Sequence, residues 1–97
     1  MAYASVVVPS YRAQLIDRCV GSLLRMDCGD FEVIVVTRPD SYFSFPDRRV
    51  RVIEQDGSGQ ANARNCGVQA SSGKSVAFTA DDCVVSKRWL SGLITAF

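Results

Sequence analysis

Short runs of β-branched residues, separated by stretches with helical spacing, place the strongest constraint on how this chain folds. The run Ala4–Val8 is stopped by Pro9, and the run Phe31–Val36 is almost continuously apolar. Valine and isoleucine pack well on a pleated sheet, and strands that are buried on both faces have this continuous apolar character. Two more short strands are predicted at Val50–Ile53 and Ser75–Phe78.

Three stretches between and after these strands are predicted to be helical. In Ala13–Met26 the apolar residues recur at spacings of three and four, which gives the segment one apolar face. Gln60–Ala70 follows a glycine-containing turn, and Lys87–Phe97 begins a further helix. This order of elements is typical of an α/β domain with a mostly parallel sheet and flanking helices. The loop Thr37–Arg49 is long, and its aromatic residues form either a satellite cluster or part of a surface completed by other chain.

Composition excludes several classes of protein. The chain has 97 residues, 47% of them hydrophobic and 22% charged, which describes one globular unit. The apolar run Val33–Val36 is far shorter than the roughly 20 residues of a membrane-spanning helix. Eleven basic and ten acidic residues are interspersed. The sequence therefore lacks the basic stripe that is typical of proteins that bind nucleic acids. We expect residues 1–97 to form a single but partial domain, because a chain this short buries only a small share of its surface when it folds.

The four cysteines and the missing histidine limit the chemistry. No CxxC pair is present and no histidine completes a ligand set, so a zinc knuckle is excluded. Cys19, Cys66 and Cys83 lie among apolar or small residues and are predicted to be buried free thiols. Without histidine, any catalysis must use carboxylates, a metal or substrate positioning. The free thiols and the absence of a secretory signal favour a cytoplasmic location, including the inner face of a membrane.

Candidate site residues follow the predicted strands. Ligands of parallel sheets bind beyond the carboxyl ends of the strands. Here these ends carry Pro9-Ser10-Tyr11, Thr37-Arg38 and Ala80-Asp81-Asp82. Adjacent carboxylates repel each other unless a cation or hydrogen bonds neutralise them, and Mg²⁺ or Mn²⁺ would do so with oxygen ligands. The alternative is that Asp81 or Asp82 caps the following helix.

Two further features each have a functional and a structural interpretation, and a third has a structural interpretation. The turn Gly57-Ser58-Gly59 either cradles a phosphate at a helix start or is a flexible turn that admits positive φ. Arg64 either orients a phosphate or a base through its planar guanidinium or is a solvated helix residue. Trp89 is interpreted as a packing residue of the last helix.

Four segments taken together carry a family resemblance: SVVVPSY (residues 5–11), EVIVV (32–36), GQANARNCGVQASSGKSVAF (59–78) and ADDCVVSKRWL (80–90). Their order and spacing resemble the amino-terminal half of a family 2 glycosyltransferase, which has the Rossmann-like GT-A fold. The most specific part is G-x-x-x-A-R-N-x-G, which spans Gly59 to Gly67. The resemblance covers nearly the whole chain and implies a transferase that binds a nucleotide-diphospho-sugar donor.

The resemblance also implies roles for individual residues. Pro9, Ser10 and Tyr11 would line the nucleoside pocket, and Arg64 would help to hold the base or a phosphate. Asp81 would contact the ribose or metal region. Asp82, as the last position of an Asp-x-Asp-type motif, would ligate the divalent Mg²⁺ or Mn²⁺ that bridges the diphosphate.

Departures from the family pattern affect the donor rather than the fold. Thr37 and Arg38 stand where the family has an acidic residue positioned for the base. Ala80 occupies the first acidic position of the triplet, and Arg12 replaces an asparagine. The sugar and the nucleotide are therefore left open.

The resemblance implies that the acceptor half and its catalytic base lie beyond Phe97, so we assign no catalytic residue. We expect a donor-binding fragment that does not turn over alone, and that self-associates through surface that further chain would cover. The alternative is a non-catalytic nucleotide-binding or interaction module of the same fold.

Overall fold

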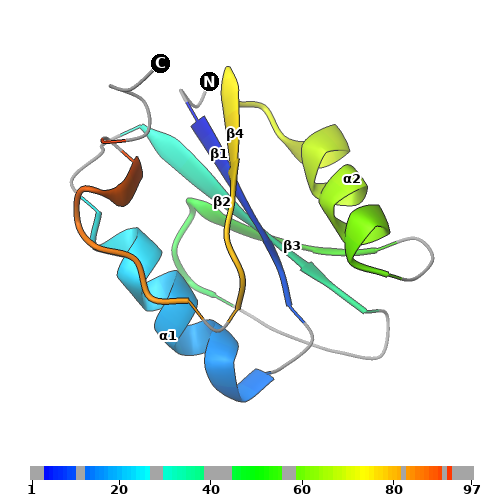
Figure 1. Cartoon of the computed structure of the whole chain (residues 1–97), viewed down its shortest axis with the longest axis horizontal. Helices are drawn as coiled ribbons and strands as arrows, with labels where there is room; N and C mark the ends of the chain where they lie inside the picture. The colour runs from blue at the N-terminus through cyan, green and yellow to red at the C-terminus, as the bar shows by residue number, and fades with distance from the viewer. Residues whose placement is uncertain are drawn as a thin grey trace.

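A four-stranded parallel sheet forms the centre of the computed structural model (Figure 1). The structure describes residues 4–10, 13–26, 30–38, 45–55, 59–81, 83–90 and 92. The strands are β1 (Ala4–Pro9), β2 (Phe31–Thr37), β3 (Val50–Glu54) and β4 (Ser75–Phe78), in the order β3-β2-β1-β4. Every pairing between them is parallel, which confirms the predicted α/β class.

Two helices cover opposite faces of the sheet (Figure 1). Helix α1 (Ala13–Leu24) connects β1 to β2, and helix α2 (Gln60–Ala70) connects β3 to β4. Successive side chains of a strand point to opposite faces. Val6 and Val8 therefore pack in the cluster on the α1 face, whereas Val7 packs in the cluster on the α2 face. This two-sided burial explains why the central strands are continuously apolar.

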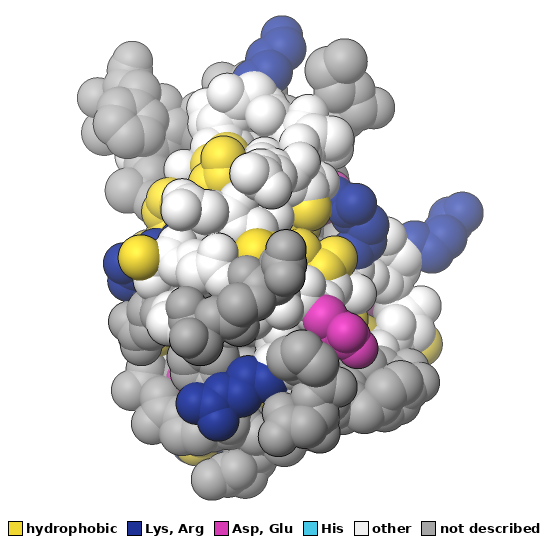
Figure 2. Space-filling model, turned by 90° about the vertical axis from the view of Figure 1, so that its right-hand side faces the viewer, with side chains coloured by type: hydrophobic (Ala, Val, Ile, Leu, Met, Phe, Trp, Pro, Cys, Tyr) yellow, Lys and Arg dark blue, Asp and Glu magenta, His cyan; other side chains and the backbone are white. Residues whose placement is uncertain are grey.

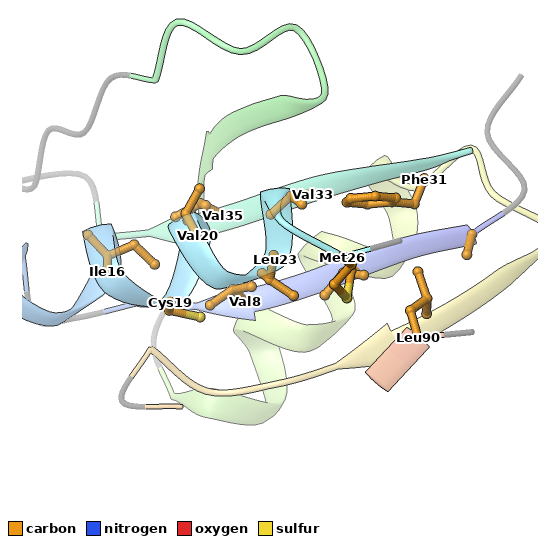
Figure 3. Close-up of a cluster of buried hydrophobic side chains, with 12 residues drawn as sticks. Val8, Ile16, Cys19, Val20, Leu23, Met26, Phe31, Val33, Val35 and Leu90 are labelled. Carbon is orange, nitrogen blue, oxygen red and sulfur yellow. The ribbon is translucent and has the colours of Figure 1, made fainter. Parts of the chain in front are cut away.

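The larger core cluster lies between α1 and the sheet (Figure 3). It joins the apolar stripe of α1 to alternate residues of β1 and β2, and its members include Val6, Val8, Ile16, Cys19, Val20, Leu23, Val33, Val35 and Leu90. The smaller cluster on the other face consists of Val7, Ile34, Val36 and Ala63. The α1 side is thus the better filled of the two layers.

Helix α2 lies very close to β1 because it presents small residues to the sheet. Ala63 is fully buried, and Gly67, one turn further on, faces Val7. A Cβ atom added to Gly67 would overlap the methyl groups of Val7. The glycine near the end of the G-x-x-x-A-R-N-x-G segment therefore sets the distance between this helix and the sheet.

The ends of two helices differ from the prediction. Helix α1 ends at Leu24 rather than Met26, because the Met26 N–H donates to the Leu23 carbonyl at 3.2 Å in a tighter closing turn. The side chain of Met26 then packs in the core. The last helical turn is first seen at Trp89 rather than Lys87.

Trp89 packs against the larger cluster together with the buried Leu90. This contact confirms its interpretation as a packing residue. Among the loop aromatics, Phe45 also packs against this cluster, whereas Tyr42 and Phe43 lie outside the described residues.

The cysteines in the described part of the chain are all free thiols, as predicted. Cys19 is buried and Cys66 is half-buried. The predicted burial is wrong for Cys83, which is exposed because it lies in the irregular segment after β4. Cys28 lies outside the described residues.

A hydrogen-bonded carboxylate ties the strands together at the amino-terminal edge of the sheet. Glu32 of β2 accepts hydrogen bonds from the Ser5 hydroxyl at 2.5 Å and from the N–H and hydroxyl of Ser72 at 2.7 and 2.9 Å. Arg51 of β3 pairs with the same carboxylate at 3.1 Å. Burial raises the pKa of Glu32, but the hydrogen bonds from Ser5 and Ser72 and the charge of Arg51 outweigh it, so the pKa lies below its ordinary value.

This lowered pKa predicts a pH dependence of stability. Because the folded state holds the Glu32 pKa below the ordinary 4.5, its contribution is present above that pH and is lost as pH falls through the folded pKa. We expect Glu32→Gln to lower the free energy of unfolding at about pH 7, and the difference from wild type to shrink towards about pH 3. Urea melts of both proteins across this range would measure it. A difference that does not change with pH would contradict the prediction.

A local ion pair fixes the turn before β3. Asp47 accepts two hydrogen bonds from the Arg49 guanidinium, at 2.9 and 3.1 Å, and one from its backbone N–H at 2.9 Å. These bonds lower the pKa of Asp47 to about 2. The same guanidinium lies over the ring of Phe31, 5.2 Å from its centroid, and so ties the turn to the start of β2.

The side of the molecule on which α2 lies has hydrophobic side chains near its middle (Figure 2). Val68 of α2 and Phe78 of β4 are 43% and 44% exposed. Self-association through uncovered apolar surface stays a prediction. Within the described residues, no helix combines the length and the hydropathy that crossing a bilayer requires.

Candidate functional site at the carboxyl edge of the sheet

The chain changes direction between β1 and β4, and this is where the candidate site lies. From β1 the chain crosses through α1 to β2, whereas β4 is reached through α2 on the opposite face and pairs with the other side of β1. Such a switch point leaves a crevice beyond the carboxyl ends of the two strands. Ser10 directly follows β1, and Asp81 follows β4 after two residues.

A hydrogen bond between side chains joins these two strand ends. The Ser10 hydroxyl donates to Oδ2 of Asp81 at 3.3 Å, although the residues are 71 positions apart. Ser10 is 0% exposed and Asp81 is 4% exposed. The Ser10 N–H donates to the Val36 carbonyl at 2.9 Å, which fixes the serine against β2. The carboxylate is therefore held in a defined place, as a positioned site residue requires.

The segment that carries Asp81 is also fastened to α1. The Cys19 thiol donates to the Ala80 carbonyl at 3.4 Å, and the Val85 N–H donates to the Ser22 hydroxyl oxygen at 3.1 Å. Figure 1 shows this segment beside α1. The next helical residue seen is Trp89, eight residues later, so Asp81 does not cap that helix. The capping interpretation is thus wrong for Asp81.

Thr37 lies at the same edge but is turned into the sheet. It is 1% exposed, and its hydroxyl donates to the Ile53 carbonyl at 3.5 Å. In this structure its side chain therefore joins β2 to β3, and its expected contact with a nucleotide stays a prediction.

Gln55, which the sequence analysis did not single out, holds the beginning of α2. It is 3% exposed, its N–H donates to the Thr37 carbonyl at 2.7 Å, and its Nε2 donates to the Gly59 carbonyl at 3.4 Å. The signal that could have found it is a polar residue directly after an apolar strand.

Helix α2 begins at a glycine with left-handed backbone geometry. Gly59 has φ 92°, which confirms a turn that needs positive φ, and no side chain caps the helix. Gly57 and Ser58 lie outside the described residues, so the phosphate-cradle interpretation stays open. Arg64 is exposed on α2, and no hydrogen bond or ion pair joins it to Ser10 or Asp81.

Two other predicted site residues, Tyr11 and Asp82, lie outside the described residues. Pro9 ends β1 and pairs in register with Val36 of β2. The structure therefore brings Pro9, Ser10, Thr37 and Asp81 to one edge of the sheet, and it leaves Arg64 on the neighbouring helix.

The oxygen atoms at this edge suit a hard divalent cation whose coordination shell would be completed by a bound diphosphate. Asp81 supplies carboxylate oxygens, and magnesium needs only one or two carboxylates when phosphate oxygens and water fill its shell. No group of three or more acidic, cysteine or histidine side chains occurs among the described residues, so they form no all-protein cage.

The fold defines the class of protein: a Rossmann-like α/β domain with a parallel sheet whose switch point lies between β1 and β4. A family model, Glycosyl transferase family 2, matches residues 5–97. The chain therefore belongs to glycosyl transferase family 2.

Curated relatives are longer than this chain. An uncharacterized glycosyltransferase, EpsJ of Bacillus subtilis (strain 168), is 36% identical over 91 residues, covering 84% of this chain and 26% of the relative. An uncharacterized glycosyltransferase of Rickettsia bellii (strain RML369-C) is 33% identical over 89 residues, covering 84% of this chain and 13% of the relative. The chain thus spans about a quarter or less of these relatives.

Solved structures confirm the GT-A fold. S. aureus TarS residues 1–349 match with a TM-score of 0.77 and 23% identity, covering 98% of this chain and 32% of that TarS region. The same TarS region in complex with UDP-GlcNAc matches with a TM-score of 0.75 and 24% identity, covering 98% and 30%. At this identity the likeness establishes the fold alone.

Proposed function

We propose that this chain supplies the donor-binding part of a glycosyltransferase that moves a sugar from a nucleotide-diphospho-sugar to an acceptor. The observation that carries the proposal is the Ser10–Asp81 contact at the switch point of the sheet. Family membership supports the reaction class. The complexes of TarS with UDP-GlcNAc and with UDP support a uridine nucleotide as the first donor to test.

In this proposal Ser10 is a positioning residue and Asp81 is a binding residue. The serine hydroxyl fixes the carboxylate of Asp81, which would contact the ribose or the metal region, and Asp82 would hold Mg²⁺ or Mn²⁺. When bound, the ion offsets the charge that develops on the departing nucleoside diphosphate. Pro9 and Tyr11 line the nucleoside pocket, and Arg64 supplies a guanidinium for a phosphate or the base.

Calorimetric titration tests the proposal. We expect UDP and UDP-GlcNAc to bind the folded chain, and manganese to strengthen that binding. GDP serves as the comparison nucleotide. A folded sample that binds none of the three, with or without manganese, would overturn the proposal. Binding that manganese leaves unchanged would support the alternative of a non-catalytic nucleotide-binding module.

A further inference from the structure

A polar groove runs along the outer side of α1, apart from the Ser10–Asp81 contact. Its volume is about 210 Å³, and its walls are Asp17, Arg18, Gly21, Arg25 and Val84. Arg18 and Val84 also line a smaller hollow that contains Asp81. The groove therefore leads to the candidate donor site along one side of α1.

Two arginines give this groove its charge. Both side chains are exposed, and neither makes a hydrogen bond or ion pair with the described residues. Arg25 lies seven positions after Arg18, in the turn that closes α1, so the two backbones are about 10 Å apart along the helix direction. Asp17 supplies one opposing carboxylate, so positive charge exceeds negative charge in the groove.

Gly21 leaves room for the Arg25 side chain on this side of α1. Nη1 of Arg25 lies 3.6 Å from the position that a Cβ atom of Gly21 would take. The Arg25 side chain thus extends back along the helix towards the turn that carries Arg18. A larger side chain at position 21 would extend into the groove.

The opposite wall is held in place. The Val85 N–H, next to Val84, donates to the hydroxyl oxygen of Ser22, which is 3% exposed and itself donates to the Cys19 carbonyl at 2.7 Å. A groove whose two walls are linked by a part-buried hydrogen bond keeps its shape before a ligand arrives, which lowers the cost of binding.

We propose that this groove binds a phosphate-bearing ligand through Arg18 and Arg25. The guanidinium group matches phosphate oxygens with paired N–H donors and keeps its charge at any physiological pH. A ligand held there lies beside the Asp81 site without using its carboxylate. The phosphate can belong to a soluble molecule or to a lipid headgroup, and the two sources are separated by experiment.

Titration with inorganic diphosphate in metal-free buffer tests this site. We expect the double variant Arg18→Gln/Arg25→Gln to weaken binding by about ten-fold or more. The matched control, Lys74→Gln/Lys87→Gln, removes the same charge from exposed positions outside the groove and should stay within about two-fold of wild type. Gly21→Gln, which fills the groove without changing its charge, should also weaken binding. Equal losses in the two double variants, or no binding by the wild type to diphosphate or vesicles, would overturn the proposal.

Two further measurements separate this site from the donor site and identify the source of the phosphate. Asp81→Asn should not weaken metal-free diphosphate binding, whereas the proposed donor site depends on that carboxylate. Sedimentation with vesicles of phosphatidylglycerol, compared with phosphatidylcholine, tests a lipid headgroup. Sedimentation only with the anionic vesicles, lost in the Arg18/Arg25 variant, assigns the ligand to a lipid, and diphosphate binding alone assigns it to a soluble molecule.

Discussion

Gly67→Ala is expected to destabilise the fold by about 1–3 kcal/mol, the usual cost of forcing an extra group into a well-packed core. The new methyl group would overlap Val7, whose side chain is fully buried in the central strand β1. The better helix propensity of alanine, worth about 1 kcal/mol, offsets only part of this cost. Urea denaturation followed by circular dichroism would measure the change.

Gly21→Ala is the matched control, because Gly21 also lies within a helix but its added Cβ would meet only the end of Arg25 at an ordinary 3.6 Å. We expect it to be neutral or to stabilise by up to about 1 kcal/mol. In a double-mutant cycle, Val7→Ala should relieve part of the cost of Gly67→Ala, with a coupling of about 0.5–3 kcal/mol. Purely additive effects would show that the close approach of α2 to β1 is not what Gly67 provides.

The strands were predictable because burial on both faces of the sheet requires continuous apolar runs in their sequences. Val6, Val7 and Val8 all had to be apolar, since alternate residues pack under α1 and under α2. Helix ends were less predictable. The apolar spacing of α1 continues to Met26, but the closing turn after Leu24 depends on backbone hydrogen bonds that no side-chain pattern records.

The edge of the sheet that carries the site was predictable, but the contacts between its residues were not. Strand ends pointed to Ser10 and Asp81, and the parallel pairing of β1 with β4 brings them together. The inward turn of Thr37 was not predictable, because it depends on where β3 pairs with β2. The register of this pairing cannot be predicted from the sequence, because the long connection between β2 and β3 has no periodic pattern of its own.

Asp81→Asn is expected to weaken manganese-dependent UDP binding by about ten-fold or more, equivalent to about 1.4 kcal/mol. Asparagine keeps an oxygen that accepts the Ser10 hydrogen bond, so the strand ends stay joined while the negative charge is lost. The melting temperature should therefore change little, which separates loss of a ligand contact from unfolding. Asp82→Asn tests the predicted metal ligand in the same titration.

The control for Asp81→Asn is Asp30→Asn, which removes one carboxylate charge from an exposed position at the start of β2, at the opposite edge of the sheet. It should leave UDP affinity within about two-fold of wild type. Ser10→Ala should have an intermediate effect, because it removes one hydrogen bond to the carboxylate without removing its charge. If Asp30→Asn weakened UDP as much as Asp81→Asn, the effect would reflect net charge, and the assignment of Asp81 to the donor site would fail. A graded loss from Asp30 through Ser10 to Asp81 would instead tie donor affinity to the carboxylate and to the hydroxyl that positions it.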